Sequence, residues 1–136
     1  MRRLYFFFAI ALLACSHKTA DQQLIDAADP AASWMATLQL TGEKWLDNSV
    51  PSSFVRATIG AAQKAFDKTS GTIAQSQARK ELRDEIKREL ETARAAAGDL
   101  QQAIEKNDRR TATEAVRRFA EASAALQRLQ QQKNRE

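Results

Sequence analysis

Apolar residues recur every three or four positions from residue 30 onward, which is the spacing that places side chains on one face of a helix. In the first such segment, Asp29 followed by Pro30 is typical of a helix N-terminus, and the pattern ends at a turn sequence, DNS. We therefore expect a first helix over residues 30–47. Its apolar stripe is formed by Trp34, Leu38 and Trp45.

Three further segments follow the same rule. The second predicted helix covers residues 51–68, between a proline and the breaker sequence KTSGT. The next stripe is the longest, and its mean step of about 3.7 residues predicts one helix over residues 72–106. Asn107 suits a left-handed helix end, and Asp108 suits the cap of a last helix that reaches about residue 132. The alternative start of that helix is a capping box, TATE, three residues later.

These elements predict an all-α protein, specifically an antiparallel four-helix bundle with two short and two long helices. The alternative is a three-helix bundle with an irregular N-terminal segment. Composition agrees, because Ala, Gln, Glu, Lys, Arg and Leu dominate the chain and favour helices. The residues expected to fill the core between the first two helices and the third are Trp34, Leu38, Trp45, Phe54, Ile59 and Phe66.

The unequal helix lengths lead to a prediction about partners. Helices of about 18 residues cannot cover one of about 35 residues along its whole length. The tip of the two long helices is therefore expected to expose an apolar strip, which often marks an association surface. We expect a protein partner or a second copy of the chain to bind this strip. It consists of Leu100, Ile104, Val116 and Phe119.

The N-terminal residues have a different pattern. Two arginines precede an uninterrupted apolar run over residues 4–14, which is too short to span a bilayer and fits the apolar region of a signal peptide. The run ends in LLAC, which places the only cysteine of the chain, Cys15, directly after Leu-Leu-Ala. This motif resembles the lipobox of bacterial lipoproteins. The alternative is an ordinary signal-peptide cut after Ser16.

The resemblance to bacterial lipoproteins implies a location. In that family the cysteine receives a diacylglyceryl group, and a dedicated peptidase then cuts in front of it. Cys15 would thus anchor the protein to the membrane of the cell envelope. Because Ser16 and not Asp follows the cysteine, the family rule implies the outer membrane, facing the periplasm, if the source is Gram-negative. The expected organisation is a signal peptide over 1–14, a lipidated cysteine and tether over 15–29, and a bundle domain over 30–136.

Charge gives no support for a nucleic-acid partner. Loss of Arg2 and Arg3 with the signal peptide lowers the formal net charge from +4 to +2. The dense charge run at residues 79–91 alternates in sign, which is typical of a solvated helix face. Arg109 and Arg110 leave open an alternative, contact with anionic lipid headgroups.

The composition also argues against catalysis. The only histidine, His17, lies in the expected tether, so the domain lacks the base that a serine or cysteine nucleophile needs. Imidazole and thiolate metal ligands, haem ligands and the Glu-x-x-His pairs of di-iron bundles are missing for the same reason. We expect a protein that is not an enzyme and that carries no metal and no cofactor.

Two functions remain. The first is a non-enzymatic, lipid-anchored envelope protein whose bundle is an interaction or scaffold module. The alternative is a bundle that binds a small apolar ligand or lipid in a cavity lined by Trp34 and Trp45, which share a helix face because they are eleven residues apart. The competing interpretation of these tryptophans is that they are core residues.

Overall fold

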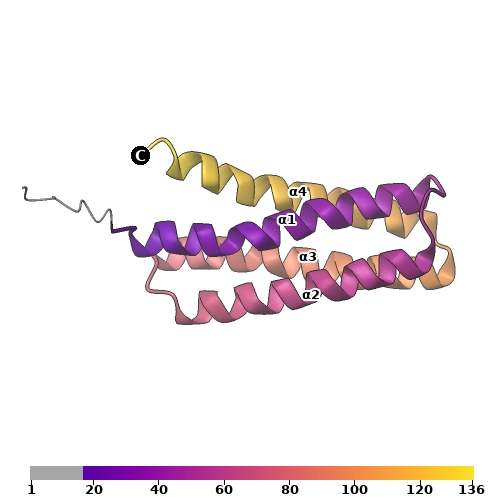
Figure 1. Cartoon of the computed structure of the whole chain (residues 1–136), viewed down its shortest axis with the longest axis horizontal. Coiled ribbons are helices and arrows are strands. Elements are labelled where there is room, and N and C mark those ends of the chain that lie inside the picture. Colours follow the sequence, from indigo (N-terminus) through magenta and orange to yellow (C-terminus); the bar gives the residue numbers. More distant parts are fainter. Residues whose placement is uncertain (1–16) are drawn as a thin grey trace, which may run out of the picture.

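The computed structural model describes residues 17–136, and within them the chain is an antiparallel four-helix bundle, as predicted (Figure 1). The helices are α1 (Ala20–Leu46), α2 (Ser52–Gln75), α3 (Lys80–Lys106) and α4 (Arg109–Lys133). All regular structure between residues 17 and 136 is helical. The expected signal peptide and Cys15 lie outside the described residues.

The four helices have nearly equal lengths of 27, 24, 27 and 25 residues, so the expectation of two short and two long helices is wrong. The first reason is that α1 begins ten residues earlier than predicted. Thr19 and Gln22 form a reciprocal capping box that starts the helix at Ala20. Pro30 therefore lies inside α1, on its exposed side, where solvent can hydrate the carbonyl group that loses its helical partner.

The second reason is that α2 continues through the predicted break at residues 68–72. Thr72 donates a hydrogen bond from Oγ1 to the carbonyl of Lys68 at 3.2 Å, within an unbroken helix that ends at Gln75. The turn lies instead at residues 76–79, where Ser76 Oγ accepts a hydrogen bond from the amide of Ala78 at 3.1 Å. α3 is correspondingly shorter than predicted.

The α3–α4 turn is confirmed. Asn107 has a φ angle of 51° in the left-handed region and ends α3. Asp108 caps α4, because its side chain accepts a hydrogen bond from the amide of Thr111 at 3.1 Å. The structure thus selects Asp108, rather than the capping box at TATE, as the start of the last helix.

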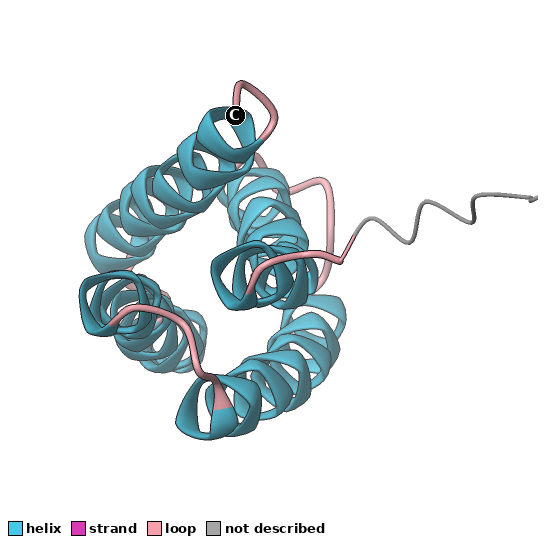
Figure 2. Cartoon of the chain, turned by 90° about the vertical axis from the view of Figure 1, so that its left-hand side faces the viewer, coloured by secondary structure: helices cyan, strands magenta, loops and turns pink. Residues whose placement is uncertain are grey.

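Each helix packs against two adjacent helices around a shared core, and α1 also contacts α3 across it (Figure 2). α1 lies between α2 and α4 and packs most extensively against α4. Among the interfaces between adjacent helices, the α2–α3 seam is the least extensive. The largest fully buried side chains include Phe66 and Phe119. Phe54 is 52% exposed, so its predicted core position is wrong. It lies on the flank of α2, directly before the buried stripe that begins at Val55.

The two ends of the bundle differ in what they contain (Figure 1). The start of α1, the loop at residues 76–79 and the end of α4 meet at one end, which we call the proximal end. Asp21 joins α1 to α3 there, because it accepts hydrogen bonds from the Arg79 amide at 2.9 Å and from Arg79 Nε at 2.5 Å. The turns at residues 47–51 and 107–108 form the distal end.

Candidate functional site

The predicted association surface is not on the surface. Exposure is 0% for Leu100, 5% for Ile104, 9% for Val116 and 0% for Phe119. The prediction fails because it rests on short first helices, and α1 instead runs along α4 to the distal end. These four residues belong to the core and offer no apolar strip to a partner.

The two tryptophans do not line one ligand cavity. Trp45 is 7% exposed, and its indole Nε1 donates a hydrogen bond to Ser52 Oγ at 3.0 Å, which fixes the start of α2 against the end of α1. Trp45 borders an open depression at the distal turn, but Trp34 does not contribute to it. Trp34 is partly buried and packs against the core. The two side chains therefore serve as packing residues.

The expected tether over 15–29 is mostly helix. α1 begins at Ala20, so only Ser16, His17, Lys18 and Thr19 separate Cys15 from the bundle. The domain accordingly begins about ten residues before the predicted boundary at residue 30. A linker of this length holds the bundle within about 17 Å of Cys15, since an extended chain spans at most about 3.3–3.6 Å per residue.

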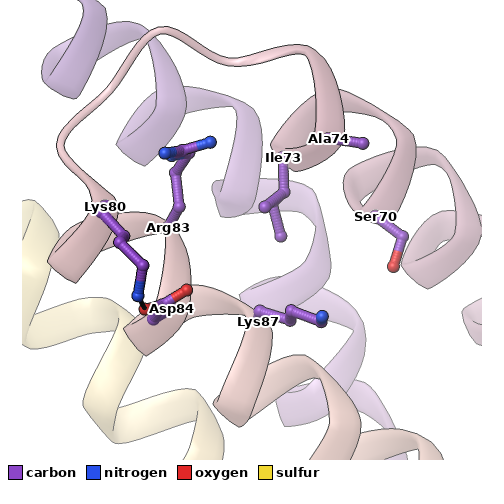
Figure 3. Close-up of a pocket in the computed structure, with 7 residues that line it drawn as sticks. All are labelled: Ser70, Ile73, Ala74, Lys80, Arg83, Asp84 and Lys87. Atoms are coloured by element: carbon purple, nitrogen blue, oxygen red, sulfur yellow. Dashed lines mark hydrogen bonds and ion pairs between the residues drawn. The ribbon is translucent and has the colours of Figure 1, made fainter.

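A surface hollow of about 290 Å³ lies between α2 and α3 near the proximal end (Figure 3). Helix α2 contributes one apolar edge and α3 contributes one charged edge. In Figure 3, Lys80 bends toward Asp84, while Arg83 and Lys87 project from α3 away from that pair. The hollow is lined by Ser70, Ile73, Ala74, Lys80, Arg83, Asp84 and Lys87.

The charges around this hollow are not balanced. Lys80 Nζ lies 2.7 Å from Asp84 Oδ2, and the hydrogen bond between them raises the pKa of Lys80 and lowers that of Asp84. Arg83 Nε is buried and has no hydrogen-bond partner within residues 17–136. Lys87 Nζ is 4.0 Å from Glu91, which is too long for a hydrogen bond. Arg83 is thus left with an unused donor, and Lys87 has only a long ion pair.

Arg94 lies on the distal side of the hollow and contacts one residue of its lining. Its guanidinium lies 2.7 Å from Asp67 and donates a hydrogen bond to Ser70 Oγ at 3.2 Å, so it ties the middle of α3 to α2. The hollow lies between this contact and the loop at 76–79.

A second charged cluster lies at the proximal end, where Asp26 accepts hydrogen bonds from both Lys18 and Lys133. These two hydrogen bonds lower the pKa of Asp26 to about 2, and the one from Lys133 has the larger effect. The cluster joins the first turns of α1 to the last turn of α4. One carboxylate thus holds two lysines from different segments, which gives the cluster a structural role at this end of the bundle.

The α2–α3 hollow was missed in the sequence for an identifiable reason. The run at residues 79–91 is correctly a charged helix face, but its cations at 80, 83 and 87 share one side of α3. The predicted break at residues 68–72 assigned residues 72–75, the last turn of α2, to the wrong helix. Ile73 and Ala74, which form the α2 edge of the hollow, were therefore not expected to face α3.

No group of three His, Cys, Asp or Glu side chains among residues 17–136 is arranged to hold a metal ion. None of the four described helices is long and apolar enough to cross a membrane. At the distal end, Arg109 donates a hydrogen bond to the carbonyl of Leu46.

Comparison of the chain with models of protein families, with curated proteins and with solved structures finds no match.

Proposed function

We propose that the chain is the precursor of a non-enzymatic, lipid-anchored protein of the cell envelope, whose helical bundle is an interaction module that faces the periplasm. The observation that carries this proposal is the sequence RRLYFFFAIALLAC at residues 2–15. A basic start, an apolar run of signal-peptide length and a lipobox-like ending occur together in it. Cys15 is the residue that would carry the lipid.

The position of α1 supports this proposal. A domain that begins at Ala20 leaves Cys15 four residues outside the folded bundle. A lipidating enzyme needs the cysteine in an extended, accessible segment, and a cleavage in front of Cys15 would remove no residue from α1. The same spacing is compatible with an ordinary cut after Ser16, so the two must be separated by experiment.

The filled interior favours an interaction module over the alternative of an apolar-ligand carrier. Met35, Leu38, Ile59 and Phe66 are at most 1% exposed and pack in the centre of the bundle. A carrier needs an enclosed apolar cavity of at least about 300 Å³. The α2–α3 hollow lies instead at the surface and has a charged edge.

Metabolic labelling with a clickable fatty acid tests the lipid attachment. We expect label on the wild-type chain, none on Cys15→Ser, and undiminished label on the matched variant Ser16→Ala, which alters the neighbouring residue only. Label retained on Cys15→Ser would contradict the proposal. Affinity purification of the acylated protein after crosslinking in intact envelopes would then identify its protein partner or a second copy of the chain.

A further inference from the structure

The short linker brings one end of the bundle close to the membrane. If Cys15 carries the lipid, as proposed above, the first residue of α1 lies within about 17 Å of the bilayer surface. The proximal end, which holds the start of α1, therefore faces the lipid headgroups. A tether over residues 15–29 would leave the whole bundle far from the anchor, whereas a start of α1 at Ala20 keeps the proximal end close to it.

The α2–α3 hollow lies at this end. Asp21 on the second residue of α1 binds both the amide and the side chain of Arg79, directly before α3. Arg83 and Lys87 are one and two turns farther along α3, about 5 and 10 Å from its start. The headgroup layer of a bilayer is about 5–7 Å thick on each side, and a basic side chain adds several ångströms of reach. Both cations can thus reach the lipid phosphates.

The lining of the hollow fits an anionic amphiphile. Arg83 Nε has no hydrogen-bond partner among the described residues and Lys87 keeps only a long ion pair with Glu91 at 4.0 Å, whereas Lys80 is hydrogen-bonded to Asp84. The opposite edge carries Ile73 and Ala74, which suit the glycerol and upper acyl region of a lipid. A phosphate held between an arginine and a lysine accepts strong charge-assisted hydrogen bonds, because the guanidinium presents several donors to the phosphate oxygens.

We propose that the α2–α3 hollow docks on the phosphate of an anionic phospholipid in the membrane that holds Cys15, with Arg83 and Lys87 as its cationic contacts. Docking fixes the bundle on the membrane through a second point besides the lipid anchor.

The test uses the mature, acylated chain in vesicles of neutral phosphatidylcholine, or of phosphatidylcholine with phosphatidylglycerol. Because the thioether at Cys15 leaves no free thiol, Gln77→Cys introduces a single labelling position in the proximal loop and Ser49→Cys one at the distal turn. Quenching of an attached fluorophore by a headgroup nitroxide reports distance from the membrane. We expect stronger quenching at position 77 than at 49, and a further increase at 77 in the anionic vesicles.

A charge-matched pair of variants separates the hollow from general attraction. Arg83→Gln with Lys87→Gln is expected to remove the increase in anionic vesicles, with the docking equilibrium weakened roughly thirtyfold, since each basic residue near such a surface contributes a factor of about five. Lys106→Gln with Arg110→Gln removes the same charge at the distal end and should leave quenching at position 77 unchanged. Circular dichroism confirms that both variants are folded.

Each outcome has a distinct meaning. The intact mass is measured first, and a chain without an acyl group at Cys15 contradicts the proposed function together with this inference. An acylated chain whose position 77 is quenched equally in neutral and anionic vesicles contradicts the docking alone. Equal effects of the two double variants would also overturn it, because the attraction would then belong to net charge and not to the hollow.

Discussion

Gly42 on α1 lies directly against Val116 on α4: a Cβ atom added to Gly42 would lie 2.5 Å from Val116 Cγ2. Glycine in a helix is less favourable than alanine by about 1 kcal/mol, so its presence near the end of α1 needs a reason. The reason is the close approach of α1 and α4, which are the two most extensively packed helices. The close approach of the two helices at Gly42 also explains why Val116 on α4 and Leu100 on α3, which both lie near this glycine, are buried.

The first prediction concerns this contact. Gly42→Ala should lower the free energy of unfolding by about 1–3 kcal/mol, because the added methyl group overpacks the interface and this outweighs the gain in helix propensity. Gly60→Ala is the control, since a Cβ at Gly60 in α2 meets no atom within 4 Å and should stabilise the protein by about 0.5–1 kcal/mol. Urea unfolding measures both. A stabilising Gly42→Ala would show that the helices do not approach closely.

The second prediction compares two phenylalanines of α2. Phe66 is fully buried, so Phe66→Ala should cost about 3–5 kcal/mol of unfolding free energy. Phe54 is half exposed, and Phe54→Ala should cost less than about 1 kcal/mol. Thermal unfolding followed by circular dichroism distinguishes them. Similar costs at the two positions would contradict the burial of Phe66 and the exposure of Phe54.

The third prediction concerns pH. The hydrogen bonds from Lys133 and Lys18 lower the pKa of Asp26 to about 2, below its ordinary value of 3.8. A lowered pKa in the folded state means that the carboxylate stabilises the fold above pH 4 and that this stabilisation is lost as the pH falls toward 2. Because the group is partly exposed, we expect the loss to be about 1 kcal/mol.

The matched variant for this pH effect is Asp26→Asn, which keeps the shape of the side chain and removes its titration. Other carboxylates with lowered pKa values, such as Asp84 and Glu114, titrate in both proteins and cancel in the comparison. The difference in unfolding free energy between wild type and variant should shrink between pH 4 and pH 2. If the difference in unfolding free energy stays constant between pH 4 and pH 2, the contacts of Asp26 do not contribute to the loss of stability in acid.

The sequence predicted the fold well where local chemistry determines it. Asn107 and Asp108 end α3 and begin α4 as expected, because a left-handed cap and an N-cap depend on residues within one turn. The stripes of α3 and α4 were also correct. Most residues predicted to face the core, among them Leu38, Ile59 and Phe66, are buried.

The predictions failed where local signals compete with packing. Pro30 is typical of a first helical position. The capping box at Thr19 and the burial of Leu24 and Ala28 nevertheless extend α1 toward the N-terminus, to Ala20. The breaker sequence KTSGT predicts an end of the second helix at residue 68, but Ile73 follows on the buried stripe and the helix continues to Gln75. These two boundary errors produced unequal helices, and the unequal helices produced the association surface that the structure does not have.

The proposed anchoring of this bundle to a membrane through Cys15 is measured by the intact mass of the mature protein isolated from the membrane fraction. We expect a chain that begins at Cys15 and is heavier than its amino-acid sequence by a diacylglyceryl group, with or without a further acyl chain. A mature protein that begins at His17 and carries no added mass would contradict it.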